Sequence, residues 1–174
     1  MDHRASSSRA GDAANRAEHS EGREKTLVHP DGTRRAFVEE GADERGEYLL
    51  VRSVVPQGGA LPGPHWHPVV EQTFGVEEGT VRFRVDGRES VLGPGEGVTV
   101  RPGQVHEFDN VGEGRLVLVE EDRPPGRHRE MCEFLHRLDL AGQLNARGIP
   151  TNPLLLGRLW ERMDGYIAGP PVFV

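Results

Sequence analysis

Residues 80–92, TVRFRVDGRESVL, decide the fold class of this chain of 174 residues. The first part of the stretch alternates apolar residues with two arginines, and a period of two is typical of a β-strand with one buried face. Asp86-Gly87 follows, and Asp-Gly is a favoured two-residue turn of a β-hairpin. Residues 90–92, SVL, then begin a returning strand. The stretch therefore predicts an antiparallel hairpin.

Further strand patterns lie on both sides of this hairpin. Residues 48–55, YLLVRSVV, and 115–119, RLVLV, are short apolar runs rich in β-branched residues, and residues 98–100 alternate again. The 23 glycines and 13 prolines suit many turns between short strands. Six or more short strands of this kind predict an all-β, antiparallel sandwich or barrel over residues 26–122.

The period changes after this region. Residues 131–138 place apolar side chains at helical spacing, and a second helix is expected near Pro153, with Asn152 as its N-cap. Its apolar stripe consists of Leu156, Leu159, Trp160 and Met163. We expect residues 123–174 to form a helical extension that packs on the barrel or on a dimer partner. Residues 1–25 contain almost no large apolar side chains and are expected to be a disordered tail.

Composition excludes several functional classes. A formal net charge of −7 argues against a nucleic-acid binder, which needs clustered lysine and arginine. The chain has no apolar run of membrane-spanning length and no apolar secretion signal at its start, so a cytoplasmic protein without a membrane partner is expected. Cys132 is the single cysteine, which excludes an internal disulfide and is compatible with a reducing cytosol.

His65-Trp66-His67 places two imidazoles two residues apart. On a strand, residues i and i+2 point to the same face, so both rings can reach one metal ion while Trp66 points to the opposite face. Alone this is a weak signal, because histidines on an edge strand have the same spacing.

Two motifs, each beginning with a glycine, strengthen this metal-binding signal. Residues 59–79 read G-x5-H-x-H, with Gly79 beyond, and residues 95–110 read G-x5-R-P-G-x2-H-x3-N, which ends in His106 and Asn110. The pair resembles the two motifs of the cupin superfamily, G-x5-H-x-H-x3–4-E-x6-G and G-x5-P-x-G-x2-H-x3-N. The resemblance implies a double-stranded β-helix, or jelly-roll barrel, and a divalent metal ion such as Zn, Fe, Mn or Ni. It also implies that His65, His67, His106 and a carboxylate of the first motif hold this ion.

The carboxylate position departs from the family pattern. Glu71 has the three-residue spacing from His67, whereas Gln72 has the four-residue spacing and is separated from Gly79 by six residues. Alternation with Phe74 favours Gln72 as the inward-pointing residue and fourth ligand, with Glu71 just outside. The alternative is that neither binds and water completes the shell. Four neutral ligands would leave the full 2+ charge on the ion, which favours Lewis-acid chemistry over iron oxidation.

Other residues have weaker assignments. Candidates for the substrate pocket wall, each of which could instead be plain core or surface, are Tyr48, Arg52, Phe74, Phe83 and Phe108. A buried Arg52 would bind an anionic substrate, and an exposed one would form an ion pair. His29, His128 and His136 have no partner pattern and are interpreted as surface residues.

These observations lead to three functional hypotheses. The first is a metal-dependent enzyme acting on a small oxygenated organic molecule, by Lewis-acid catalysis of isomerase, cyclase or lyase type or by O2-dependent dioxygenation. In this hypothesis Glu71 serves as a general base if it turns inward. The alternatives are a non-catalytic small-molecule-binding or sensor cupin, and a storage-like cupin with a vestigial site. The open edges of a double sheet, and the resemblance, also lead us to expect a homodimer.

Overall fold

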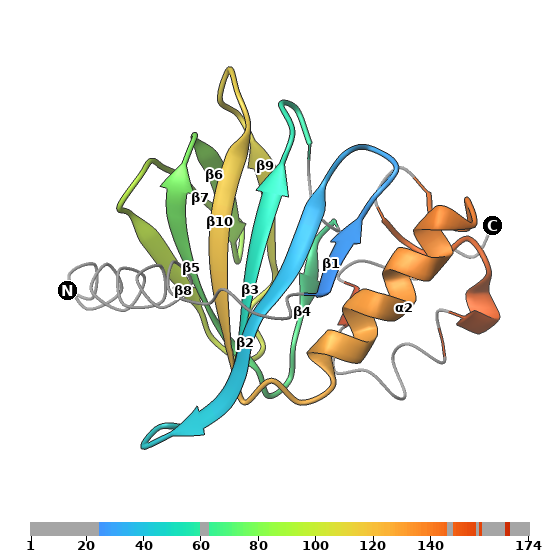
Figure 1. Cartoon of the computed structure of the whole chain (residues 1–174), viewed down its shortest axis with the longest axis horizontal. Coiled ribbons are helices and arrows are strands. Elements are labelled where there is room, and N and C mark those ends of the chain that lie inside the picture. Colours follow the sequence, from blue (N-terminus) through green and yellow to red (C-terminus); the bar gives the residue numbers. More distant parts are fainter. Residues whose placement is uncertain (1–24, 60–62, 146–147, 156, 158–165, 168–174) are drawn as a thin grey trace.

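Two antiparallel β-sheets face each other, and helix α2 lies beside the strands at one edge of the sandwich (Figure 1). This computed structural model describes residues 25–59, 63–145, 148–155, 157 and 166–167. The larger sheet has the strand order β1-β2-β3-β10-β5-β8 and the smaller one β11-β4-β9-β6-β7. The arrangement confirms the predicted all-β jelly roll.

The strands are short and separated by turns. Those of the larger sheet are β1 (Lys25–Val28), β2 (Arg34–Asp43), β3 (Gly46–Val55), β10 (Leu116–Arg123), β5 (Glu71–Glu78) and β8 (Gly97–Val100). Those of the smaller sheet are β11 (Tyr166–Ile167), β4 (His65–Trp66), β9 (His106–Asn110), β6 (Val81–Val85) and β7 (Arg88–Leu92).

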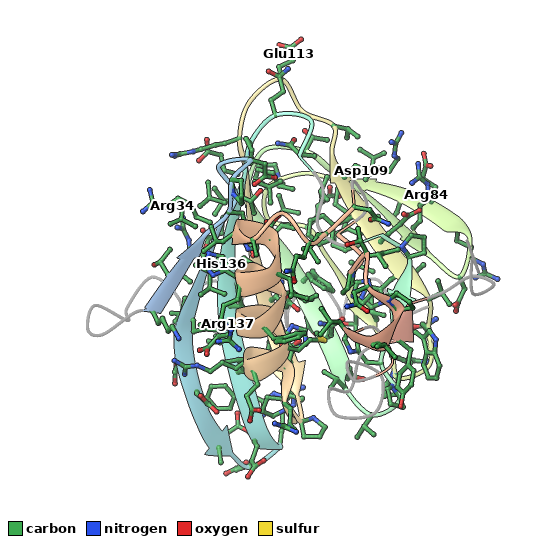
Figure 2. The ribbon with its side chains drawn as sticks, turned by 90° about the vertical axis from the view of Figure 1, so that its right-hand side faces the viewer. Arg34, Arg84, Asp109, Glu113, His136 and Arg137 are labelled. Atoms are coloured by element: carbon green, nitrogen blue, oxygen red, sulfur yellow. The ribbon has the colours of Figure 1, made fainter. Side chains whose placement is uncertain are left out.

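The hairpin predicted from residues 80–92 is confirmed as β6 and β7. Asp86 and Gly87 both have positive φ, 49° and 76°, which a two-residue turn with the twist of the flanking strands requires. Phe83 is fully buried on the inner face. Arg84 points outward beside Asp109 of β9 (Figure 2), and its Nη1 lies 3.4 Å from Oδ2 of that residue. The alternation of the sequence therefore separates the core from the charged outer face.

The core between the sheets is apolar over only half its length. Inward side chains of β10 begin with Leu116 and Leu118 and continue with Glu120 and Asp122, all buried. The apolar half contains a cluster of buried residues: Val55, Phe74, Val76, Val81, Phe83, Val100, Phe108, Leu116 and Leu118. Burial of these side chains stabilises the fold by roughly 1.5–3 kcal/mol each, and it leaves the polar half available for a site.

Helix α2 (His128–Leu140) covers the inner side of β1, β2 and β3. Its Cys132 packs with Leu27, Phe37, Leu49 and Val51 from these strands. The first C-terminal helix is thus confirmed.

The second predicted helix begins with residues 153–155, and its apolar stripe lies outside the described residues, as does the predicted tail apart from Lys25. Within the described ranges, no helix has the length and apolar character that a membrane crossing needs.

Candidate metal centre

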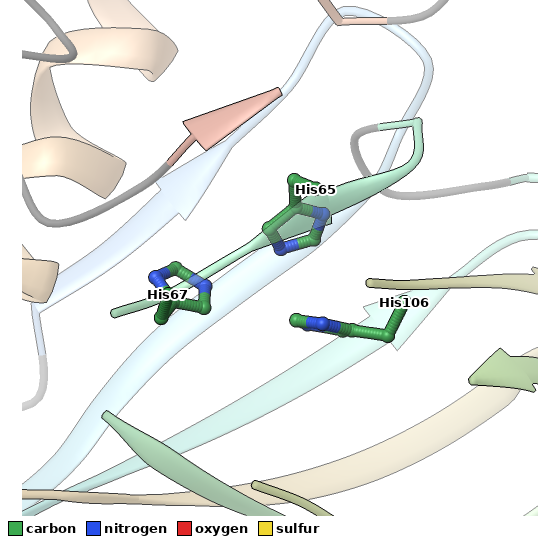
Figure 3. A group of neighbouring side chains, drawn as sticks. All are labelled: His65, His67 and His106. Atoms are coloured by element: carbon green, nitrogen blue, oxygen red, sulfur yellow. The ribbon is translucent and has the colours of Figure 1, made fainter. Parts of the chain in front are cut away.

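Three imidazoles converge at the polar half of the barrel (Figure 3). His65 and His106 are directly paired across β4 and β9, and His67 follows β4 by one residue. The ring centroids of His65 and His106 are 4.2 Å apart, and that of His67 lies 5.2 Å from the first and 5.7 Å from the second. Each ring offers a nitrogen such that all three nitrogens lie within 4.8 Å of one another. This is the spacing of ligands to one ion.

Backbone carbonyls orient two of these rings. Nδ1 of His65 lies 3.0 Å from the carbonyl oxygen of Gly63, and Nδ1 of His106 lies 3.2 Å from that of Gln104. A carbonyl only accepts, so Nδ1 carries the proton and Nε2 keeps its lone pair. Nε2 of His106 is buried and has no hydrogen bond to the described residues. Such an orphaned acceptor fits a metal ligand held by a hydrogen bond behind it.

Burial also favours the neutral form of His65 and His106. Loss of solvation lowers the pKa of His65 well below 6.5, and the neighbouring His106 and His67 lower it further. Burial lowers the pKa of His106 as well. Neutral imidazole is the form that binds metal ions.

Residues of the second motif hold the loop that presents His106. The backbone N–H of Gly103 donates to the carbonyl oxygen of His67 over 2.7 Å, and Gly103 has a φ of 84°. The carboxylate of Asp86, in the hairpin turn, accepts from Val105 N at 2.9 Å and from Gln104 Nε2 at 2.8 Å. The hairpin and both motifs therefore form one connected support for the cluster.

Gln72 and Glu71 lie on opposite faces of β5, as strand alternation predicts. Gln72 is buried on the inner face, opposite Asp122 in the register, whereas Glu71 is half-buried on the other face. Nε2 of Gln72 donates to Glu120 over 2.6 Å and to Asp122 over 3.0 Å. Its Oε1 is buried and has no hydrogen bond to the described residues. The two carboxylates thus take the amide hydrogens and leave the amide oxygen available as a ligand.

Glu120 and Asp122 were missed by the sequence reasoning. Glu120 accepts a 2.8 Å hydrogen bond from Arg35 Nη2. Burial raises the pKa of Glu120, but Arg35 and His128 outweigh it, so the net shift is downward. Burial and the charge of Glu120 raise the pKa of Asp122 well above 3.8. The signal available in the sequence was the acidic run directly after the apolar RLVLV strand.

The interpretation of His128 as a surface residue is wrong. The side chain begins α2 and is only 4% exposed, because the helix start packs against the open half of the barrel. Its ring centroid lies 5.4 Å from that of His67. Burial lowers the pKa of His128, but Cys132 and Glu120 raise it by more.

The predicted pocket residues separate into two groups. Phe74, Phe83 and Phe108 pack on one another in the apolar core, and the Phe74 ring lies 6.3 Å from that of His106. The structure does not bring Tyr48 and Arg52 to the histidines: alternation along β3 turns them to the outer face of the larger sheet. There Tyr48 donates to Glu39 and Arg52 pairs with Glu77 at 2.8 Å.

A cavity of about 670 Å³ lies between α2 and the two sheets. Its lining includes Arg35, Cys132 and Phe108, together with Gly63 and Pro64, which directly precede His65. The volume is within the roughly 300–1,000 Å³ of typical small-molecule sites. The cavity therefore borders residues that flank the histidine cluster.

Comparisons with known proteins agree with this geometry. A family model described as "Cupin domain" matches residues 51–120, and no curated protein matches the chain. An RmlC-like cupin from Shewanella frigidimarina has 20% identity and a TM-score of 0.50, over 60% of this chain and 88% of that one.

Two further solved structures are less similar in shape. KdgF from Halomonas sp. has 19% identity and a TM-score of 0.49, over 56% of this chain and 84% of that one. A cupin-superfamily sugar phosphate isomerase from Silicibacter pomeroyi has 14% identity and a TM-score of 0.48, over 57% of this chain and 70% of that one. At these identities structural likeness supports the fold alone, whereas the family model and the two motifs carry the assignment. Residues 51–120 of this chain are therefore a cupin domain.

Proposed function

We propose that this chain is a metal-dependent enzyme that acts on a small oxygenated organic molecule by Lewis-acid catalysis, of isomerase, cyclase or lyase type. The observation that carries the proposal is the convergence of three imidazoles whose donor nitrogens lie within 4.8 Å of one another. Imidazole rings at this spacing match the ligand set of a divalent ion better than that of an organic cofactor.

Four residues would hold the ion: His65, His67, His106 and Gln72, the last through Oε1. A bound Zn, Mn, Ni or Fe(II) ion would supply a Lewis acid that polarises a substrate oxygen. Imidazole and amide bind metal ions in their neutral forms, and the carboxylate of Glu120 accepts a 2.6 Å hydrogen bond from Nε2 of Gln72. A ligand shell without an anion favours an ion that keeps its 2+ charge, which is why we place Lewis-acid chemistry before dioxygenation.

The surrounding residues support such a role. The carbonyls of Gly63 and Gln104 fix the two ring orientations, so little reorganisation is needed when an ion binds. The Phe74 ring, whose centroid lies 6.3 Å from that of His106, places the apolar core beside the site. The 670 Å³ cavity offers room for a small molecule next to the loop that carries His65.

Metal content and turnover together test the proposal. Purified full-length chain is expected to bind Zn or Ni, and His106→Ala is expected to lose about 10²-fold or more in affinity for the three-histidine site while remaining folded by circular dichroism. His136→Ala is a matched control, because His136 lies on α2 (Figure 2), is not one of the three clustered histidines, and its Nε2 lies 2.9 Å from the carbonyl oxygen of Val28. A panel of small hydroxy- and keto-compounds is then assayed with Zn, Mn, Ni and Fe(II), with and without O2.

Turnover with Zn in the absence of O2 is the expected result. Turnover that strictly requires both Fe(II) and O2 would overturn the Lewis-acid proposal in favour of dioxygenation. Equal metal affinity in wild type and His106→Ala would overturn the metal centre itself. Tight binding of a compound without any conversion would favour the sensor hypothesis instead.

A further inference from the structure

A second cluster of metal-ligating side chains lies deeper in the barrel. Glu120 and Asp122 come from the inner face of β10, and His128 comes from the first turn of α2. Each of the three offers one ligand atom, and these atoms lie within 4.8 Å of one another. All three side chains are more than nine-tenths buried. None of them belongs to the histidine cluster described above.

Three atoms of this cluster lack a hydrogen bond to the described residues, whereas both carboxylate oxygens of Glu120 already accept one. Nε2 of His128 lies 3.5 Å from Oε1 of Glu120 and 3.7 Å from Oδ2 of Asp122. Within the described part of the chain, neither ring nitrogen of His128 nor Oδ2 of Asp122 forms a hydrogen bond. Buried polar atoms without partners are uncommon, because each costs about 1–3 kcal/mol of stability.

The distances from Nε2 of His128 to the two carboxylate oxygens suit a single small cation. Two ligand atoms about 2.1 Å from an ion, at a tetrahedral angle, lie about 3.4 Å apart. The observed 3.5 Å and 3.7 Å are close to this spacing, whereas direct hydrogen bonds would bring the atoms closer.

An outer layer of hydrogen bonds holds the two carboxylates in place. Arg35 donates to Oε2 of Glu120 over 2.8 Å, and Gln72 donates to Oε1 of Glu120 and to Oδ1 of Asp122. Oδ2 of Asp122 is left open toward His128. Such supporting contacts are typical of metal ligands, whose orientation is set by the residues behind them.

We propose that Glu120, Asp122 and His128 form a second divalent-cation site, of the kind that zinc occupies. Two carboxylates and one imidazole are common zinc ligands. A cation here would supply positive charge to two buried carboxylates that face one arginine. The proposal does not depend on the function assigned to the three-histidine site, because the two sites share no ligand.

The test counts zinc ions in full-length chains that lack the first site. The double variant His65→Ala/His106→Ala is equilibrated with Zn²⁺ and desalted, and zinc per chain is measured by mass spectrometry. About one ion per chain is expected in the variant and about two in the wild type. Adding His128→Gln is expected to remove the remaining ion, whereas adding His136→Gln on the same helix leaves it in place. Thermal unfolding without zinc checks that each variant is folded.

Two outcomes would overturn the proposal. A folded double variant that binds no zinc ion would leave the cluster as an internal network of ion pairs and hydrogen bonds. If the zinc ion is retained after His128→Gln, it binds at a place other than this cluster. The first of these results needs no substitution in the buried cluster, so a His128 variant that fails to fold does not affect it. Failure of the function proposal would appear separately, in turnover with the first site intact.

Discussion

Asn110 joins three segments of the barrel, one of which is the strand that carries His106, and its removal is expected to destabilise the whole barrel. The side chain is 4% exposed. Its Nδ2 lies 3.1 Å, 3.0 Å and 2.9 Å from the carbonyl oxygens of Val55, Pro56 and Gly114, and its Oδ1 accepts from Gly112 N at 3.1 Å. One amide group therefore joins the end of β3 and the β9–β10 turn to β9, the strand that begins with the metal-centre histidine of the second motif.

The cost of Asn110→Ala follows from these contacts. The amide has two hydrogens for three carbonyls, so two bonds from Nδ2 and one to Oδ1 form at a time. At about 1 kcal/mol for each net hydrogen bond, the loss is about 3 kcal/mol. For a chain of this length that is a fall in Tm of roughly 6–12 °C. Because the total stability of a domain is about 5–15 kcal/mol, this is a large fraction.

Urea unfolding of the metal-free protein, followed by circular dichroism, measures this difference. Asn152→Ala is a suitable control, because Asn152 is exposed and its Oδ1 accepts a single bond, from Leu154 N at 3.0 Å. The control is expected to lose about 1 kcal/mol or less. If Asn110→Ala loses no more than the control, the joining role assigned to Asn110 is refuted.

Three further predictions concern the turn, the surface and the core. Asp86→Ala removes the acceptors for Val105 N and Gln104 Nε2 and places alanine at a φ of 49°. The zinc affinity of the three-histidine site, measured by calorimetry, should therefore fall about 10-fold. The affinity should fall less in Asp86→Asn, because asparagine tolerates this φ. Lys25 lowers the pKa of Glu133 below 4.5, so this ion pair contributes stability above pH 4.5 that is lost as pH falls through the lowered pKa. Glu133→Gln should therefore cost less than about 1 kcal/mol at pH 7 and nothing at strongly acidic pH in urea titrations, and an equal cost at both pH values would contradict the assignment. Phe83→Ala should lose about 3–5 kcal/mol without changing zinc content, and selective loss of zinc would instead place Phe83 in the site.

Local patterns were sufficient to predict the hairpin and the faces of its strands. The alternation before Asp86 separates core from surface because successive side chains of a strand point to opposite sides. The same rule places Gln72 inward and Glu71 outward on β5, with Gln72 in the buried interior and Glu71 half-buried on the other face. These properties depend on neighbours within a few residues, and such neighbours are visible in a sequence.

The buried polar cluster depends on contacts that are distant in the chain. An acidic run such as residues 120–122 is usually solvated. Here it lies in β10, a strand with partners on both sides, β3 and β5, so its inward carboxylates are enclosed. His128 is enclosed because α2 returns over the inner face of β1 to β3. Neither strand order nor helix placement can be read from the spacing around these residues.

The charge at the candidate metal centre shows how this limit affects chemistry. Counting only the motif residues gives three imidazoles and one amide, which leaves the whole 2+ charge on a bound ion. The structure adds Glu120, which hydrogen-bonds Nε2 of Gln72 over 2.6 Å and so polarises the amide toward a more negative oxygen. A neutral ligand backed by a carboxylate is a stronger donor than an isolated amide, although it carries no charge of its own. The Lewis acidity of a bound ion would therefore depend on Glu120 and its partner Arg35 as well as on the motif. Substitution of Glu120 by glutamine should weaken zinc binding at the three-histidine site, measured by calorimetry, although the four ligands of that site are unchanged.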